Sequence, residues 1–161
     1  MIVVSNTSPI INLATIGQLD LLRQLYGRVV IPQAVYDEIV ETGAQQPGAV
    51  QVRTSDWIET RQVSDRRLAA ELEAEVDKGE AQAIVLAKEL QADLLLIDER
   101  KGRRVAGRFG IRVVGLLGVL VVAKQRGHVA AVKPVLDALI SQAGFWIGKS
   151  LYDQVLETMG E

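Results

Sequence analysis

The sequence predicts an α/β domain with a mostly parallel central sheet covered by helices. This prediction rests on short all-apolar runs that alternate with longer segments of helical period. The apolar runs are too short for helices and lack polar alternation, which is typical of strands buried on both faces. They lie at residues 2–5, 28–31, 94–97 and 112–114, and an edge strand is expected at residues 57–61.

The segments between these runs carry apolar residues at three- and four-residue steps and predict helices. They span residues 10–25, 33–41, 65–76, 80–90 and 100–108. Gly27, Gly79 and Gly110 fall where helices should start or stop, and Pro32 suits the first turn of a helix. Residues 41–51 are expected to form a loop, and residues 113–123 a strand end followed by a buried helix.

Composition indicates one domain over residues 1–161, because 161 residues with 48% hydrophobic content support one core and not two. Residues 144–161 form its tail, in which Ser150 is expected to cap a final helix that carries Asp153.

A chain without cysteine has no disulfide, thiolate zinc site or cysteine nucleophile, which fits a reducing cytoplasm. The longest apolar stretch is too short to span a membrane. With a net charge of −2, nucleic acid must be bound by a local patch.

Polar residues directly after the predicted strands are the first candidates for a site. Asn6 and Ser8 follow the first strand, and Asp98 and Glu99 follow the strand at residues 94–97. In an open parallel sheet, ligands bind outside the carboxyl ends of the strands. Helix geometry adds two acids, Glu38 in the helix after Pro32 and Glu80 at the start of its helix.

Each candidate, taken singly, also has a structural explanation. Asn6 or Ser8 can cap the following helix, and Glu80 suits a first turn. Glu38 suits a solvated face, whereas Asp98 and Glu99 can be a cap and a first-turn acid. Only their convergence on one sheet edge favours a site.

Several carboxylates brought together repel one another unless a cation compensates them. Oxygen ligands suit hard ions such as Mg²⁺ or Mn²⁺, which can polarise a phosphate and activate water, as in nucleases. Other chemistries have less support, because the sequence has no P-loop, dinucleotide-binding glycine motif or nucleophile elbow. The single histidine, His128, lies in an expected loop.

The predicted helix at residues 100–108 is strongly basic. It carries Arg100, Lys101, Arg103, Arg104 and Arg108, of which three recur at four-residue steps. These residues can hold an RNA phosphate near Asp98, or they can form a solvated face with Val105 and Phe109 turned to the core. With only seven aromatic residues in the chain, no stacking platform for bases is evident.

Four segments match the PIN-domain superfamily in order and spacing. They are VVSNTSP, IPQAVYDEIV, DKGEAQAIVLAKE and LLIDERKGRRVA. The chain resembles this superfamily over nearly its whole length. It is closest to a domain-of-unknown-function branch of prokaryotic PIN proteins related to VapC-type toxins, and the tail GFWIGKSLYDQVL is also similar to that branch.

The resemblance implies a three-layer α/β/α sandwich and a cytoplasmic Mg²⁺- or Mn²⁺-dependent ribonuclease of the toxin–antitoxin kind. It places the metal-binding and catalytic positions at Asn6, Glu38, Glu80 and Asp98, with Ser8 in support and Glu99 either an accessory ligand or a helix acid. It also implies RNA as substrate, an antitoxin protein as partner, and a homodimer.

Asn6 departs from the pattern, because the resemblance expects an acid at that position. An amide oxygen can ligate a cation but adds no negative charge and cannot act as a general base. The sequence therefore leaves two functions open, an active ribonuclease and a catalytically weakened protein that binds RNA or a protein partner. A receiver-like phosphoacceptor domain is disfavoured, because it needs an acidic pair after the first strand.

Overall fold

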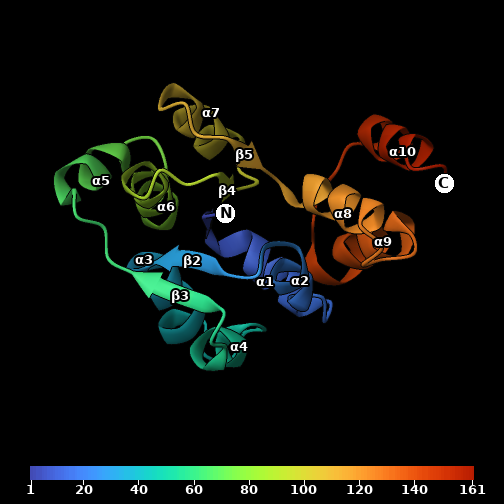
Figure 1. Cartoon of the computed structure of the whole chain (residues 1–161), viewed down its shortest axis with the longest axis horizontal. Coiled ribbons are helices and arrows are strands. Elements are labelled where there is room, and N and C mark those ends of the chain that lie inside the picture. Colours follow the sequence, from blue (N-terminus) through green and yellow to red (C-terminus); the bar gives the residue numbers. More distant parts are fainter.

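The computed structural model describes residues 1–161 and contains one five-stranded parallel sheet with the order β3-β2-β1-β4-β5 (Figure 1). The strands are β1 Val3–Ser5, β2 Val29–Pro32, β3 Ile58–Arg61, β4 Leu94–Leu96 and β5 Val113–Val114. Four of them lie where the apolar runs predicted them, and β3 is the expected edge strand. The parallel sheet of the predicted α/β fold is thereby confirmed.

Helices occupy most of the remaining chain. They are α1 Thr7–Thr15, α2 Asp20–Tyr26, α3 Gln33–Tyr36, the π-helical segment η1 Asp37–Thr42, α4 Ala49–Thr54, α5 Arg66–Leu72, α6 Lys78–Glu89, α7 Arg100–Arg108, α8 Leu116–Gln125, α9 Val132–Ala143 and α10 Lys149–Thr158. None of them combines the length and the apolar character that a bilayer crossing requires.

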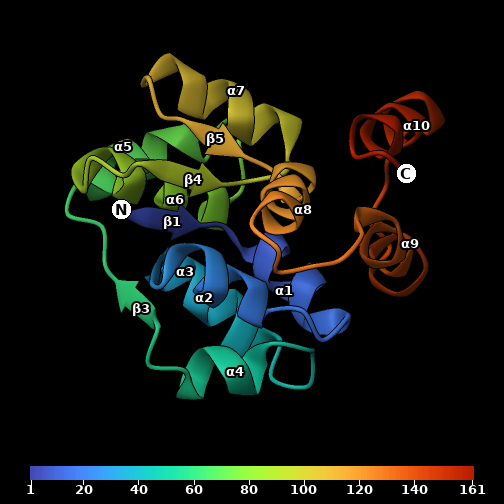
Figure 2. The same ribbon diagram turned by 45° about the vertical axis from the view of Figure 1, so that its right-hand side comes forward.

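The two faces of the sheet bury separate cores, because successive side chains in a strand point to opposite faces. Val3 of β1 belongs to the core under α1, α2, α8 and α9, whereas its neighbour Val4 belongs to the core under α5, α6 and α7. In β4, Leu94 belongs to the first of these two cores and Leu95 to the second. Figure 2 shows β1, β4 and β5 side by side between these helices. The result is the three-layer α/β/α sandwich that the family resemblance implied.

In the N-terminal half of the chain, two segments differ from the sequence-based expectation. Residues 10–25 were expected to form one helix, but the helix breaks into α1 and α2 around Gly17, whose φ of +71° is readily adopted only by glycine. The expected loop at residues 41–51 is partly helical, because η1 runs to Thr42 and α4 starts at Ala49. Ala49 and Val52 are buried, so packing outweighs the loop-like composition. Pro32 is the last residue of β2 and precedes the helix.

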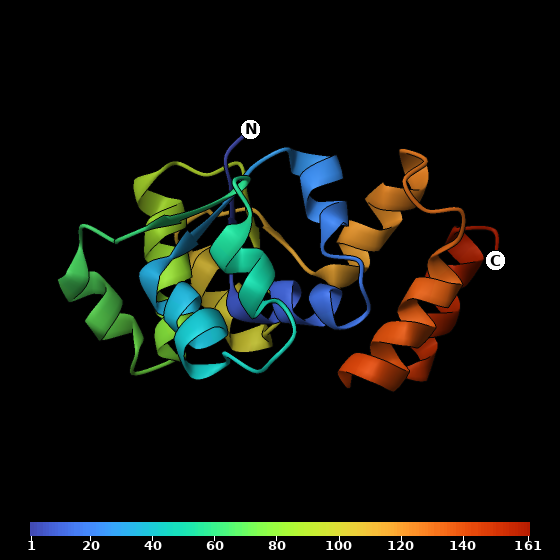
Figure 3. The same cartoon turned by 90° about the horizontal axis from the view of Figure 1, so that it is seen from below.

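The C-terminal region also differs. Helix α9 was not expected, and Ser150 lies inside α10, whose N-cap is Gly148 without a side-chain hydrogen bond. Asp153 accepts a hydrogen bond from Lys149 instead of closing a capping box. Figure 3 shows α9 and α10 together at one end of the molecule and α5 at the other.

The strand order places a topological switch point between β1 and β4. The helices that follow β1 and β2 pack on one face, whereas those that follow β3 and β4 pack on the other. Connections therefore diverge where the carboxyl ends of β1 and β4 lie side by side, with Ser5 in register with Leu96. In sheets of this type, that divergence leaves a crevice for ligands.

Candidate functional site

Asn6 is the first polar residue at the switch point. Its backbone N–H donates to the Leu96 carbonyl at 3.0 Å, so the chain leaves β1 alongside β4. Although it precedes α1, its side chain makes no capping hydrogen bond, and the residue is buried. Asn6 instead lines a cavity of about 200 Å³ together with Glu38, Glu80 and Glu99. The capping role considered for Asn6 is therefore not present in the structure.

Glu38 enters the same cavity from η1. The Gly43 N–H donates to the Glu38 carbonyl at 3.0 Å, a bond across five residues that makes this turn π-helical, a feature frequent at functional sites. Its Oε2 accepts a hydrogen bond from the Thr7 hydroxyl at 2.8 Å. Burial and the nearby charge of Asp77 raise the pKa of Glu38, while the Thr7 hydrogen bond offsets part of that rise.

Glu80 is the most perturbed acid of the chain. It lies in the first turn of α6, where the Asp77 side chain caps the helix by accepting the Glu80 N–H at 2.8 Å. The Glu80 residue is only 7% exposed. Burial, followed by Asp77 and the charges of Glu99 and Glu38, raises the pKa of Glu80 to about 8. Neither Glu38 nor Glu80 has a salt-bridge partner.

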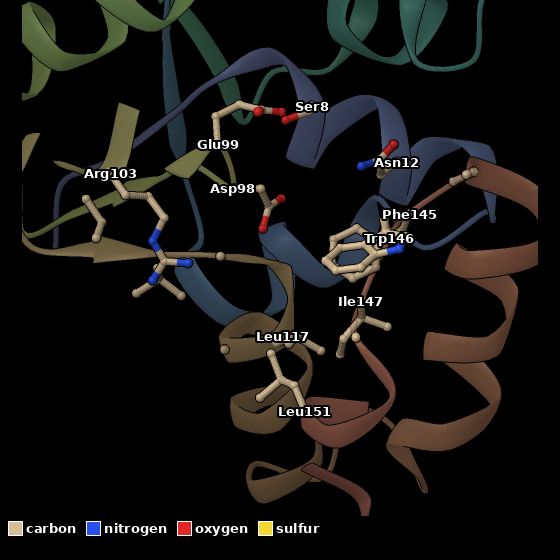
Figure 4. Close-up of a pocket in the computed structure, with 17 residues that line it drawn as sticks. Ser8, Asn12, Asp98, Glu99, Arg103, Leu117, Phe145, Trp146, Ile147 and Leu151 are labelled. Atoms are coloured by element: carbon tan, nitrogen blue, oxygen red, sulfur yellow. The ribbon is translucent and has the colours of Figure 1, made fainter. Parts of the chain in front are cut away.

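Asp98 follows β4 and faces a second, larger cavity of about 790 Å³ (Figure 4). Its Oδ1 accepts the Leu116 N–H at 2.9 Å, whereas its Oδ2 is buried without a partner, as is the Ser8 hydroxyl. Burial raises the pKa of Asp98, against the opposing effects of the Leu116 amide and Arg103. A buried polar oxygen without a partner costs about 1–3 kcal/mol, and a bound ion or water would remove that cost.

The two cavities adjoin each other. Ser8, Asn12 and Glu99 line both of them. The structure thus brings Asn6, Glu38 and Glu80 into one cavity and places Asp98 in the next, with Glu99 between them. No three His, Cys, Asp or Glu side chains are grouped closely enough to form a ready-made metal site.

Three glycines make room for the three acids. A Cβ on Gly79 would overlap Glu38 Oε1. A Cβ on Gly102 would lie 2.9 Å from Glu80 Oε2, and one on Gly115 would lie 2.7 Å from Asp98 Oδ1. Side chains at these positions would displace the carboxylates, so the glycines help to fix where the acids lie.

The basic residues of α7 are distributed unequally. Arg103 lines the larger cavity, and Arg100, Lys101 and Arg104 are exposed. Arg108 donates to both carboxylate oxygens of Glu75 at 2.9 and 2.7 Å, and it lines neither cavity. The opposite side of α7 turns to the core, with Val105 buried and Phe109 packed against it. Arg103 is therefore the basic side chain closest to the site.

Sequence reasoning missed several residues that line or shape the cavities. Asp77 had a readable signal, because an acid three residues before Glu80 has the spacing of a helix cap. No signal in the sequence indicates the hydrogen bond of Thr7 or the place of Asn12 in the cavity lining, because both depend on which face of α1 meets the sheet edge. Trp146 was also missed, although it is 84% exposed and lines the larger cavity.

Comparison with known proteins decides the family. A family model described as "PIN domain" matches residues 2–161. The chain belongs to the PIN-domain family. This PIN domain is also similar in fold to the solved structure of a PilT N-terminus domain protein from Sulfolobus solfataricus P2, with 15% sequence identity, a TM-score of 0.52, and coverage of 88% of this chain and 95% of that one. No curated protein matches the sequence. The resemblance inferred from the four sequence segments is confirmed.

The residues of this PIN domain have the chemistry that a hard divalent cation requires. The side chains at the sheet edge offer only oxygen as a metal ligand, from an amide, hydroxyls and carboxylates. Burial and neighbouring carboxylates raise the pKa of Glu38 and that of Glu80, and a cation would oppose both effects. The unpartnered Asp98 Oδ2 and Ser8 hydroxyl supply free acceptors beside them.

Proposed function

We propose that this PIN domain is a metal-dependent endoribonuclease that hydrolyses RNA phosphodiesters. The observation that carries the proposal is the placement of Glu38, Glu80 and Asp98 at the switch point of the sheet, where no salt bridge neutralises them. Carboxylates that are wholly or partly removed from water without an ion pair lower stability. A function that uses their negative charge explains why they are there.

Asn6, Glu38, Glu80 and Asp98 would hold Mg²⁺ or Mn²⁺, and Glu99 would serve as an accessory ligand. A divalent ion supplies positive charge that polarises a phosphate and lowers the pKa of water. Water would complete the coordination of the ion, as Mg²⁺ prefers.

Other residues of the chain hold these acids in place. The Thr7 hydroxyl fixes one oxygen of Glu38, and Asp77 fixes the first turn of α6 that carries Glu80. The Leu116 amide holds Oδ1 of Asp98, which leaves Oδ2 free. Arg103 lies at the same cavity and can pair with an RNA phosphate, supported by the exposed Arg100, Lys101 and Arg104.

The partners proposed with this function are RNA, an antitoxin protein and a second copy of the chain. The larger cavity reaches from Asp98 to the tail around Trp146 and Leu151, both of which are exposed. A protein that covered this cavity would block access to Asp98. We therefore propose that the chain acts as a toxin component whose inhibitor binds here.

Asn6 supports a second candidate function, a catalytically weakened PIN protein that binds RNA or a partner. The side chain at this position adds an oxygen to the cavity but no charge. Asn6→Asp separates the two functions. If the wild-type site is weakened by its missing charge, the variant should bind Mn²⁺ more tightly and cleave RNA faster. Unchanged affinity in titration calorimetry would exclude a metal role for this position.

The direct test is cleavage of structured and unstructured RNA by the purified chain with Mn²⁺. We expect cleavage that chelator abolishes and that Asp98→Asn reduces at least about 100-fold, the scale on which loss of one charged catalytic contact acts. Glu157→Gln, which changes an exposed glutamate on α10, is the control and should cleave normally. Cleavage that survives both chelator and Asp98→Asn would indicate a contaminant and refute the proposal.

A further inference from the structure

Trp146 is unusual in its combination of exposure and order. It is 84% exposed, the highest value among the large hydrophobic residues of the chain. It lies in the segment between α9 and α10, where Phe145 and Ile147 on either side pack against the core. Because side chains alternate in an extended segment, these two neighbours direct the indole outwards. The packing of its neighbours therefore directs the Trp146 side chain towards solvent.

The segment is also anchored at both ends. The Phe145 N–H donates to the Leu139 carbonyl at 3.0 Å, and the Gly148 carbonyl accepts the Tyr152 N–H at 3.0 Å. A Cβ on Gly148 would lie 3.8 Å from the far edge of the Trp146 ring. Because the backbone is anchored, only the side-chain rotamer of Trp146 has to be fixed when a ligand binds.

Trp146 shares a cavity with charged groups of both signs. Figure 4 shows Asp98 with Arg103 on one side and Trp146 on the other, and all three line the cavity of about 790 Å³. Fewer than half of the lining residues are hydrophobic. A purely apolar helix of a partner would leave Asp98 and Arg103 without compensation, at a cost. A nucleotide suits Arg103 and Trp146, since it offers a phosphate to the guanidinium and a flat aromatic base to the indole.

We propose that Trp146 is a stacking platform for an unpaired base of single-stranded RNA, next to the phosphate held at Arg103. This inference rests on the proposed ribonuclease function and specifies its substrate as single-stranded at this position. Stacking on an aromatic side chain tolerates any base, so Trp146 contributes affinity and register but little sequence preference. Although the chain has few aromatic residues, Trp146 alone is enough to stack one base, because it lines the cavity that also contains Arg103.

The experiment uses the full-length Trp57→Phe variant, in which Trp146 is the only tryptophan. Its fluorescence is titrated, in chelator so that no cleavage occurs, with a single-stranded ribo-oligonucleotide and with an abasic oligonucleotide of equal length. We expect saturable quenching by the first and none by the second. Equal quenching by both would overturn the proposal, because the two probes share their backbone charge.

Affinity is measured separately by fluorescence anisotropy of the labelled oligonucleotide, with Trp57 intact. Trp146→Leu should weaken binding at least about fivefold, and Trp146→Phe should restore part of the loss. Unchanged affinity in Trp146→Leu would overturn the proposal. If that variant instead lost a self-association that the wild type shows in ultracentrifugation, with RNA affinity unchanged, the indole would be a contact between copies.

These binding measurements are independent of hydrolysis. Quenching by single-stranded RNA in a chain that never cleaves RNA would support the platform and refute the ribonuclease. Cleavage of RNA without base-dependent quenching would support the ribonuclease and refute the stacking platform. The two proposals can therefore fail separately.

Discussion

Glu80 and Glu161 are two glutamates in opposite environments. Glu80 is buried among Asp77, Glu99 and Glu38, and its pKa rises to about 8. Glu161 accepts hydrogen bonds from Lys124 Nζ at 2.8 Å and from the backbone of Val132 and Lys133, and these contacts lower its pKa to about 2.

The difference separates a structural acid from a functional one. Glu161 joins the end of α8 to the start of α9, and every group around it favours its charge. The groups around Glu80 oppose its charge. A ligand that supplied the missing positive charge would explain such a carboxylate, so the contrast supports the proposed site around Glu80.

Among variants that keep every acid of the site, the largest effect should come from filling the space beside one of these acids. Gly79→Ala places a Cβ against Glu38 Oε1. The far end of a flexible side chain can move, so the fold should survive while Glu38 is displaced. We expect RNA cleavage and Mn²⁺ affinity to fall about 10- to 100-fold, the usual effect of disturbing the support of a metal ligand.

The matched control is Gly107→Ala, because that helical glycine has no atom within 4 Å of the added Cβ. It should keep full activity and gain about 0.5–1 kcal/mol of stability from helix propensity. Equal activity in both variants would show that the position of Glu38 is unimportant.

The second effect concerns stability at high pH. With a folded-state pKa of about 8 and an ordinary value of 4.5, Glu80 contributes stability below pH 4.5 that is lost as the pH rises through 8. Glu80→Gln cannot ionise, so it should exceed the wild type by about 1 kcal/mol or more at pH 8.5 and match it near pH 4.5. Urea unfolding in chelator measures this difference. A variant that is less stable than the wild type at pH 8.5 would contradict the account of Glu80.

The third prediction concerns Glu161, whose contribution to stability depends on pH in the opposite sense to that of Glu80. The folded-state pKa of Glu161 is depressed to about 2, so its contribution is present above 4.5 and is lost as the pH falls towards 2. Glu161→Gln should lower the melting temperature at neutral pH, and the loss should vanish in acid. Glu157→Gln should show no such loss. A melting temperature unaffected by Glu161→Gln would mean that this network does not stabilise α8 and α9.

The comparison also shows what the sequence could predict. Four of the five strands followed from short apolar runs, since a strand buried on both faces excludes polar residues. The placement of Asn6, Asp98 and Glu99 at one sheet edge followed from their positions after strands.

Other features depend on tertiary packing and left no local pattern. Gly79 lies beside Glu38 because α6 packs against α3, which leads directly into η1. Trp146 is exposed while its two neighbours, which are partly buried, pack against the core. Helix α9 and the break at Gly17 were not predicted, because apolar periodicity alone does not show where a helix starts or stops.

The central claim is that Glu80 lacks a positive charge that a divalent cation supplies. Titration calorimetry of Mn²⁺ into the wild type, Glu80→Gln and Glu157→Gln tests it most directly. We predict that Mn²⁺ binds the wild type and Glu157→Gln equally and binds Glu80→Gln at least about tenfold more weakly. Equal binding to the wild type and Glu80→Gln, or none to the wild type, would contradict the claim.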